Sequence, residues 1–407
     1  MMRFTFPWFL LACLAPLALH AVQPSLLKFE ARVPLLRQQI PALIKSAEKS
    51  AENSLQHPKA AITMPRRIQE PFAAELLSRA GGLGGAWYAD KSREIANEPD
   101  TVLLSIRSWE THAELLMPLL TDYKARGWTT VVFASAAGKP DNMAADFFID
   151  NGAPSPAKEY GYINTLANTT LGWMWVCEYA AAMSRKGQFP GILYSVAMPG
   201  AKDHNKTLQG AEHRGAYSAC PMAIPGGELA EIYLKRTEKM IGDLKSTHIQ
   251  GQLTQAASII AERMNAGRTV GITGTGHYIL DEVRETDMQA PWKQFRSTGK
   301  TNPFSTNLKP GELLVFFTYL GMKSAYYDFL PSIQEAGVDL ITSYAVDPIW
   351  SKDPPTTLAH IDQSWQLPDA EVPIPVFPNL MAPVSGINTG LLLRMLDDEV
   401  ARRLVRK

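Results

Sequence analysis

The feature that most constrains the fold is a regular alternation of short apolar runs with segments of helical period. In the first half the runs are "AAITM" (60–64), "TVLLSI" (101–106) and "TTVVFAS" (129–135), and the helix-like "HAELLMPLLTDYKARG" lies between the last two. Apolar strands separated by helices are typical of a parallel sheet that helices cover on both faces. The sequence therefore predicts an α/β fold.

The second half repeats this order of parts. Its apolar runs are "RTVGIT" (268–273), "LLVFFT" (313–318) and "VDLITSY" (338–344), and a helical stripe from Leu253 to Met264 precedes the first of them. We therefore predict two doubly wound parallel-sheet domains in tandem, of the flavodoxin type.

Particular residues also recur between the halves. A shift of 210 positions places Ile62 on Ile272, Ser108 on Thr318 and Gly127 on Gly337. A later pair, "YINT" (162–165) and "GINT" (386–389), matches at a shift of 224. Each match is short, and their common order along the chain is what supports a repeat. We expect domains at 30–186 and 229–405, joined by a Gly- and Pro-rich linker at 187–228.

The first 21 residues differ from the rest. Arg3 is followed by an apolar run that holds no charge until Lys28, and small residues at Ala18 and Ala21 precede a polar stretch. This pattern predicts a signal peptide that is cleaved near Ala21, and thus export to a periplasmic or extracellular location. The alternative is an uncleaved membrane anchor, although the run is short for a span of ~20 residues.

Composition excludes several classes of function. The chain has 40 basic and 40 acidic residues, so no net field attracts a nucleic acid. It has no His-Glu-x-x-His motif and no cysteine cluster, so neither a metal nor another cofactor is expected. Two cysteines, Cys177 and Cys220, remain after residue 21, and the sequence leaves open whether they pair. It also leaves open whether the chain forms a homo-oligomer.

A glycine turn follows the first strand of the second half. Gly274, Thr275, Gly276 and His277 connect that strand to a predicted helix. Glycines remove Cβ atoms between backbone amides and a guest, and the amides that begin a helix attract anions. We interpret the turn as a cradle for a phosphate or carboxylate, and a tight turn without a guest is the alternative. The first half has Arg66 and Arg67 at the matching place.

Hydroxyl side chains follow other predicted strands. Ser108, Glu110 and Thr111 lie where the first half's second strand enters a helix, and these hydroxyls can cap the helix or bind ligand oxygens. The second half offers Thr318 and Ser324 at the corresponding place, and Ser385 at the start of the last helix. Capping without a ligand is the alternative for each of them.

These stretches together resemble the sugar isomerase (SIS) family of phosphosugar-binding domains, present twice. The resemblance is carried by four stretches: "GRTVGITGTGH" (267–277), "FAAELLSRAGGL" (72–83), "LLSIRSWETHAELL" (103–116) and "APVSGINTGLLL" (382–393). It implies five-stranded parallel sheets that bind a sugar phosphate at the strand ends.

The resemblance also implies which residues match the family's loops. Ser108, Glu110 and Thr111 match the family's Ser-x-Ser-Gly-Glu-Thr phosphate loop, and residues 274–277 match its glycine turn. Two residues depart from the pattern. Ile106 replaces the loop's first serine and Trp109 replaces its glycine in the first half. The second half keeps only Thr318, Gly321 and Ser324 of that loop, so neither half carries a complete site.

The residues leave three functions open, of which the weakest is a scaffold that keeps the fold and has lost its ligand. The first hypothesis is an exported protein that binds a phosphosugar or amino sugar without turnover, which the altered loops favour. The alternative is an aldose–ketose isomerase, which needs an acid and a base near the sugar. The candidates for those roles are Glu110, Glu212, His213 and His277. The sequence does not decide whether the protein is an enzyme.

Overall fold

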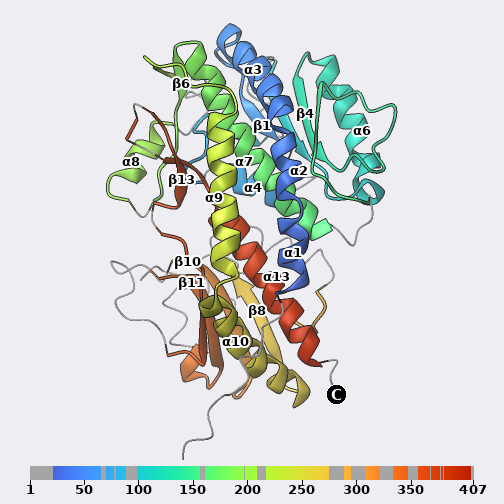
Figure 1. Cartoon of the computed structure of the whole chain (residues 1–407), viewed down its shortest axis with the longest axis vertical. Helices are drawn as coiled ribbons and strands as arrows, with labels where there is room; N and C mark the ends of the chain where they lie inside the picture. Colours follow the sequence, from blue (N-terminus) through green and yellow to red (C-terminus); the bar gives the residue numbers. More distant parts are fainter. Residues whose placement is uncertain are drawn as a thin grey trace, which may run out of the picture.

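The computed structural model describes residues 22–404 with internal gaps (Figure 1). The segments outside the description are 1–21, 66–69, 78, 89–98, 156–160, 197, 209–216, 275–287, 295–307, 321–332, 347–355, 367, 376, 379 and 405–407.

The first half contains a five-stranded parallel sheet. Its strands are β1 (Ile62–Met64), β2 (Ala86–Tyr88), β3 (Thr101–Ser105), β4 (Thr129–Ala134) and β5 (Phe147–Asp150). The order across the sheet is β2-β1-β3-β4-β5, and every neighbouring pair is parallel. This is the strand order of flavodoxin-type folds.

The second half contains a sheet with the same order. Its strands are β8 (Val270–Gly274), β9 (Lys293–Gln294), β10 (Leu313–Leu320), β11 (Asp339–Ala345) and β12 (Ala359–Asp362). They are arranged as β9-β8-β10-β11-β12, again parallel throughout. The predicted class, two doubly wound parallel sheets in tandem, is confirmed.

The helices lie on the faces of these sheets and between them. In the first half they are α1 (Pro24–Glu30), α2 (Val33–Gln38), α3 (Ile40–Gln56), α4 (Glu70–Leu76), α6 (Trp109–Ala125) and α7 (Gly161–Arg185). In the second half they are α9 (Glu228–Leu244), α10 (Thr247–Asn265) and α13 (Ser385–Leu404). Helix α7 is buried along almost its whole length, and Trp173 and Trp175 on it belong to the core. Within the described residues, no helix combines the length and hydropathy that crossing a bilayer requires.

The segment that the sequence predicts as a linker has secondary structure of its own. Strands β6 (Gln188–Pro190) and β7 (Tyr217–Ala219) pair antiparallel, and the short helix α8 (Ala201–Lys206) lies between them in the chain. An isolated bridge joins Ile192 to Leu83 of the first half. Cys177 and Cys220 are both free and buried.

Strand register refines the correspondence between the halves. Thr101 pairs with Ile62 and with Thr129, whereas Leu313 pairs with Val270 and with Asp339. Leu313 therefore occupies the place of Thr101, which makes Thr318 the equivalent of Ile106. The constant shift of 210, which puts Ser108 on Thr318, is wrong at this strand because the connections before it differ in length.

A recurring aspartate supports this correspondence. Asp150 ends β5, and its carboxylate accepts hydrogen bonds from the amides of Ala136 (2.9 Å) and Gly152 (3.0 Å). Asp362 ends β12, and the same carboxylate oxygen accepts from Val346 (3.4 Å) and Ser364 (3.0 Å). In both sheets the aspartate thus holds the loop that follows the neighbouring strand, which is β4 in the first sheet and β11 in the second.

The same strand ends are also tied to an early helix in each half. The amide of Asp150 donates to the side chain of Gln39 at 3.1 Å, and the amide of Asp362 donates to that of Gln252 at 2.9 Å. Gln39 directly precedes α3, and Gln252 lies in α10. Helices α3 and α10 therefore have equivalent places.

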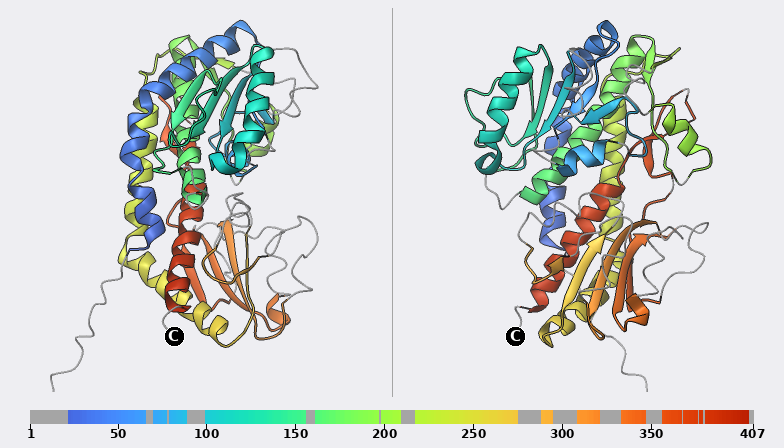
Figure 2. Two further views of the ribbon diagram at one scale, coloured as in Figure 1. Left: turned by 90° about the vertical axis from the view of Figure 1, so that its right-hand side faces the viewer. Right: turned by 180° about the vertical axis from the view of Figure 1, so that it is seen from behind.

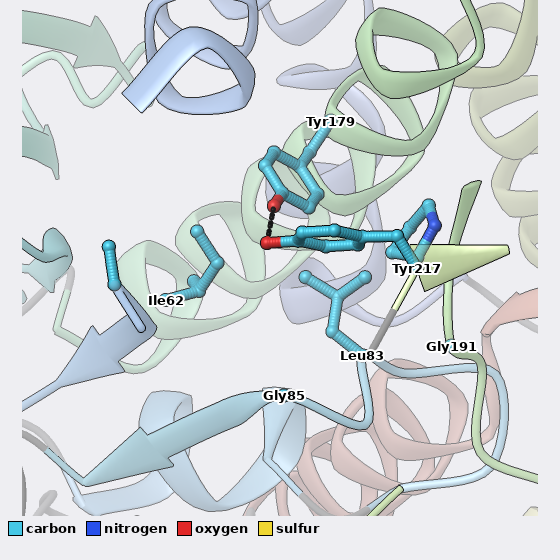
Figure 3. Close-up of a pocket in the computed structure, with 8 residues that line it drawn as sticks. Ile62, Leu83, Gly85, Tyr179, Gly191 and Tyr217 are labelled. Carbon is cyan, nitrogen blue, oxygen red and sulfur yellow. Dashed lines mark hydrogen bonds between the residues drawn. The ribbon is translucent and has the colours of Figure 1, made fainter. Parts of the chain in front are cut away.

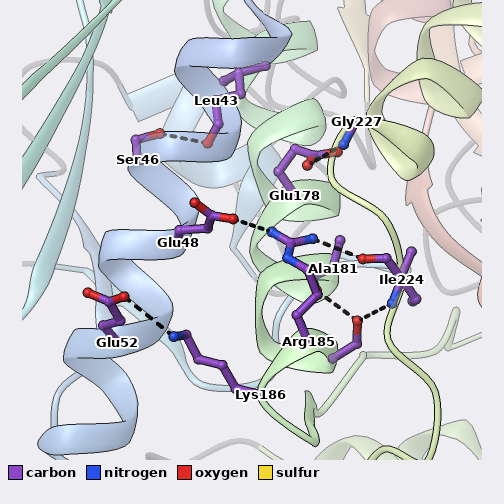
Figure 4. Close-up of polar contacts among 11 residues, drawn as sticks. Leu43, Ser46, Glu48, Glu52, Glu178, Ala181, Arg185, Lys186, Ile224 and Gly227 are labelled. Atoms are coloured by element: carbon purple, nitrogen blue, oxygen red, sulfur yellow. Dashed lines mark hydrogen bonds and ion pairs between the residues drawn. The ribbon is translucent and has the colours of Figure 1, made fainter.

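Each half packs its first helix against the other half (Figure 2). Helix α9 lies along α7 of the first half, and α1 lies along α13 of the second half. In each case a carboxylate of one half accepts backbone amides at the start of the other half's first helix. Glu178 of α7 accepts from Gly227 (2.9 Å) and Ala230 (3.3 Å) at the start of α9, as Figure 4 shows for Gly227. Asp398 of α13 accepts from the amide of Ser25 in α1 at 2.9 Å.

Candidate functional site

The carboxyl edges of the two sheets meet in the middle of the molecule. Helices α7 and α13 begin at these edges, and the start of α7 touches α13 near its N-terminal end. The Tyr162 hydroxyl donates to the backbone oxygen of Gly390, and the Arg394 guanidinium lies 4.3 Å from the centre of the Tyr162 ring. Ligands of parallel α/β sheets bind at such carboxyl edges.

In the first half, the predicted phosphate loop follows β3. Ser108 is the residue before α6; it is buried and its side chain makes no capping bond to the helix. Glu110 and Thr111 lie exposed in the first turn of α6, and the Thr111 hydroxyl lies 3.4 Å from the Ser108 carbonyl oxygen. The sequence thus places these three residues together at one strand end.

Trp109 fills the space that a glycine would leave in this loop. Its indole N–H donates to the carbonyl oxygen of Ser135 at 2.7 Å, and its ring packs in an apolar cluster with Ile106 and Leu116. A close approach of a ligand to the backbone at residue 109 is therefore blocked by the side chain.

Two asparagines of α7 and one that directly follows β5 bind further polar groups of this edge. Asn168 donates to the Ser105 hydroxyl (2.8 Å) and accepts from Asn151 (2.9 Å). Asn164 donates to the Arg107 carbonyl oxygen (2.7 Å) and accepts from Arg32 (3.2 Å). Among the described residues, the ends of β3 and β5 are consequently bridged by a network of the protein's own side chains.

In the second half, Gln363 connects three elements of the edge. Its amide nitrogen donates to the carbonyl oxygens of Thr318 (3.0 Å) and Ser343 (3.2 Å), and its oxygen accepts from Trp365 (2.9 Å) and Thr389 (3.3 Å). Gln363 corresponds to Asn151, because each directly follows the recurring aspartate. Thr318 is buried beside it near the carboxyl end of β10, and Gly274 ends β8.

Carboxylates surround the start of α13. The Ser385 hydroxyl donates to Asp369 at 2.7 Å, and the Glu75 carboxylate from the first half lies against Gly386, where a Cβ would collide with it. Arg79 lies 3.6 Å from Glu75.

Tyr233 of α9 lies near these carboxylates. Burial, followed by the charges of Cys177, Glu75 and Asp369, raises the pKa of Tyr233 well above its usual value. The Tyr233 hydroxyl donates to the Pro383 carbonyl oxygen at 3.0 Å.

The amide oxygen of Asn388, in the first turn of α13, differs from the Ser385 hydroxyl in having no described partner. Its side chain is 1% exposed, and its Oδ1 has no hydrogen-bond donor in the part of the chain that the structure describes. Asn164 is the equivalent residue of α7, and its oxygen accepts from Arg32. A buried acceptor without a donor costs free energy, so such a group points to a missing partner. The matching "YINT" and "GINT" segments contain both asparagines, and this match was the signal that could have identified them.

Other predicted site residues lie outside the described residues. They are Thr275, Gly276, His277, Ser324, Glu212 and His213. Their proposed roles stay predictions. No group of three or more metal-ligating side chains occurs among the residues whose positions are described.

Comparisons with known proteins bear on the fold. No family model matches the chain, and no curated protein does. Solved structures match it. A protein assigned as a phosphosugar isomerase from Clostridium difficile 630 has a TM-score of 0.50 at 11% identity, covering 93% of this chain and 92% of its own.

Two further structures are similar at lower scores. The C-terminal domain of glucosamine-fructose-6-phosphate aminotransferase from Francisella tularensis has a TM-score of 0.47 at 12% identity, covering 94% of this chain and 96% of its own. Tagatose-6-phosphate ketose/aldose isomerase from Escherichia coli has a TM-score of 0.44 at 10% identity, covering 95% and 94%. The chain has an SIS-type fold, as the motifs predict.

Proposed function

We propose that the chain is an exported protein that binds a phosphosugar or amino sugar at the carboxyl edge of its second sheet. The observation that carries the proposal is the difference between Asn388 and its equivalent Asn164. The oxygen of Asn164 has a donor in Arg32, whereas that of Asn388 has none among the described residues. A hydroxyl or ammonium group of a sugar derivative is a donor of the required kind.

The surroundings of Asn388 suit such a ligand. Thr318 stands where the first half has Ile106, so the second half has a hydroxyl at a place where the first half has none. Gly274 ends the neighbouring strand without a Cβ, and the anion cradle predicted for residues 274–277 begins there. The similar structures are assigned to proteins named for phosphosugars, which supports the same ligand class here.

Isothermal titration with glucosamine 6-phosphate tests the site. We expect binding by the wild type and a weakening of about 10- to 100-fold in Asn388→Ala, because hydrogen bonds to a charged group contribute ~1.5–3 kcal/mol. Ser108→Ala, at the carboxyl edge of the first sheet, is the matched control and should bind as the wild type does. Equal losses in both variants, or no loss in Asn388→Ala, would contradict the assignment to the second half.

A second measurement separates binding from isomerisation. Under the binding proposal, incubation of the protein in D₂O leaves the C2 proton of glucosamine 6-phosphate and the C1 protons of fructose 6-phosphate unexchanged by NMR. Entry of deuterium would instead support the aldose–ketose isomerase. The loss of the phosphate loop's serine at Ile106 and of its glycine at Trp109 is the reason to favour binding alone.

Export is the other part of the proposal. The first described helix begins at Pro24, shortly after the expected cleavage at Ala21. N-terminal sequencing of the protein recovered from the periplasmic or extracellular fraction should begin at Val22. Recovery of the uncleaved chain with membranes would favour the anchor instead.

A further inference from the structure

A histidine lies on the strand that leads into Gln363. His360 is in β12, the outermost strand of the second sheet, and pairs in register with Thr342 of β11. Its Nδ1 lies 3.1 Å from the Thr342 hydroxyl oxygen, and its ring centre lies 4.2 Å from that of Tyr344. The imidazole is therefore held against β11, at a point three positions before Gln363 in the chain.

The other ring nitrogen of His360 has no partner in the described part of the chain. Its Nε2 is buried and makes no hydrogen bond. Tyr179 of α7 shows the usual arrangement, because its hydroxyl donates to Ser54 at 2.9 Å and lies 3.5 Å from that of Tyr217 (Figure 3). The pocket beside these tyrosines has a volume of about 20 Å³, room for about one water and not for a ligand. Buried polar groups without a partner are rare, so the bare nitrogen of His360 is an exception that points to a role.

A proton cannot be added to His360 without cost. In the neutral ring, Nδ1 either donates to the Thr342 hydroxyl or accepts from it, according to the tautomer. In the imidazolium both nitrogens carry hydrogen, so Nε2–H becomes a buried donor that no described group accepts, and a charge is buried with it. The folded state therefore disfavours the charged ring.

The groups that act on the ring come from β12 itself and from β11 and α10, which pack against it. Burial lowers the pKa of His360 below its usual value, Asp362 and the Thr342 bond act in the opposite direction, and His248 of α10 lowers the pKa further. Tyr344 of β11 stays neutral, because burial and then Asp362 raise its pKa. The unfolded chain binds the histidine proton at a pKa of ~6.5, so this strand loses stability as the pH falls below that value.

The end of β12 is linked to the ligand site. The amide nitrogen of Gln363 donates to the carbonyl oxygen of Thr318 at 3.0 Å, and its oxygen lies 3.3 Å from the Thr389 hydroxyl. Thr389 directly follows Asn388 in the first turns of α13. A displacement of the end of β12 therefore disturbs the turn that carries the Asn388 oxygen.

We propose that His360 makes the ligand site of the second half sensitive to acid. Protonation of the ring destabilises the carboxyl end of β12, and the loss of the Gln363 contacts weakens binding beside Asn388. The inference rests on the ligand site proposed above and adds its regulation. Histidine changes charge between about pH 5 and 8, and the proposed export exposes the protein to the pH outside the cell.

Isothermal titration with glucosamine 6-phosphate at pH 7.5 and pH 5.5 tests the inference. The wild type is compared with His360→Asn, whose amide can still bond Thr342 but does not titrate. The phosphate of the ligand changes its own protonation equally for both proteins, so the comparison isolates the histidine. We expect acid to weaken binding by the wild type about 5-fold or more beyond its effect on the variant, the lower end of typical coupling between sites. His248→Gln, exposed on α10, is the matched control and should keep the acid response of the wild type.

Hydrogen exchange followed by mass spectrometry tests the strand without a ligand. At pH 5.5 the peptide that spans β12 should exchange faster in the wild type than in His360→Asn, and this difference should shrink at pH 7.5. A thermal melt at pH 7.5 shows that each variant is folded. Where His360→Asn does not fold, His360→Phe takes its place, because its ring can still pack on Tyr344.

The outcomes separate the regulation from the site itself. Binding that weakens equally with acid in the wild type and in the folded variant overturns the inference and leaves the proposed site intact. Exchange of β12 that does not depend on residue 360 at pH 5.5 also overturns it. Absence of binding at pH 7.5 contradicts the proposed site and with it the regulation of that site, even where exchange shows that β12 opens in acid.

Discussion

Glu178 offers a sharp test of how the two halves are joined. Its carboxylate is fully buried and accepts the amides of Gly227 and Ala230, which have no acceptor within the first turn of α9. In Glu178→Ala, each amide that loses its acceptor costs ~1–3 kcal/mol, so two cost roughly 2–6 kcal/mol. The burial penalty of the carboxylate is relieved at the same time, and we expect a net loss of about 2–4 kcal/mol at pH 7.

The pH dependence of this effect has a definite sign. Burial raises the pKa of Glu178 above its usual value, although both amides and Arg185 act in the opposite direction. A carboxyl group with a raised pKa in the folded state contributes most below the unfolded pKa of ~4.3, and the contribution declines as the pH rises toward the folded pKa. The stability difference between the wild type and Glu178→Gln, which cannot ionise, should therefore decrease from pH 4 to pH 8.

Urea unfolding followed by tryptophan fluorescence measures both effects. Glu48→Gln is the control: Glu48 pairs with Arg185 at 3.0 Å, but its side chain is 47% exposed, and such pairs contribute only ~0–1 kcal/mol (Figure 4). A loss in Glu178→Ala no larger than that in Glu48→Gln would refute the role of the carboxylate. A stability difference between the wild type and Glu178→Gln that grows with pH would refute the raised pKa of the buried Glu178 carboxyl as its cause.

Three other predictions concern the fold. Gly81→Ala should lower the free energy of unfolding by more than the ~1–2 kcal/mol of a left-handed backbone, because the φ of Gly81 is +76° and a Cβ would also lie 2.6 Å from a backbone nitrogen of β14 (Leu380–Pro383). Gly187→Ala is the control: its φ is +75° but a Cβ there meets open space, so a thermal melt should show only the backbone part of the loss. Fragments 22–225 and 226–404 should each lack a cooperative unfolding transition alone and should co-purify when expressed together, because the halves exchange their first helices; a cooperative transition in either fragment alone contradicts this. Burial raises the pKa of the Cys177 thiol well above its usual value, so mass-spectrometric mapping should find Cys177 labelled by a thiol reagent only at the rate of unfolding, and rapid labelling of the native protein would count against it.

Hydrophobic pattern determined the strands that lie at the centre of each sheet. Strands β3, β4, β10 and β11 are buried on both faces, so their sequences are continuous apolar runs that can be recognised without coordinates. The edge strands β5 and β12 were missed, because "FFID" and "AHID" are short and only partly buried. Their positions depend on pairing with β4 and β11, which the local sequence does not express.

Only part of the candidate site could be predicted, because the local sequence does not express contacts with distant residues. Loop chemistry identified Ser108, Thr318 and Ser385 at strand and helix ends, where hydroxyls are common because they can bind nearby backbone groups. Whether such a group is engaged depends on distant residues. The Ser385 hydroxyl is bound by Asp369, and the loop after β3 is closed by Asn164 and by the indole of Trp109.

The sequence by itself determined the class of fold and the ends of strands at which polar residues gather, because these depend on local periodicity and turn chemistry. Only the tertiary structure decided which residues are equivalent, since hydrogen-bond register matches Thr318 to Ile106 across connections of unequal length. It also decided that Glu178 joins the halves and that the Asn388 oxygen lacks a described donor. Contacts of this kind join groups far apart in the chain, and their energies depend on burial that arises only when the two halves pack together.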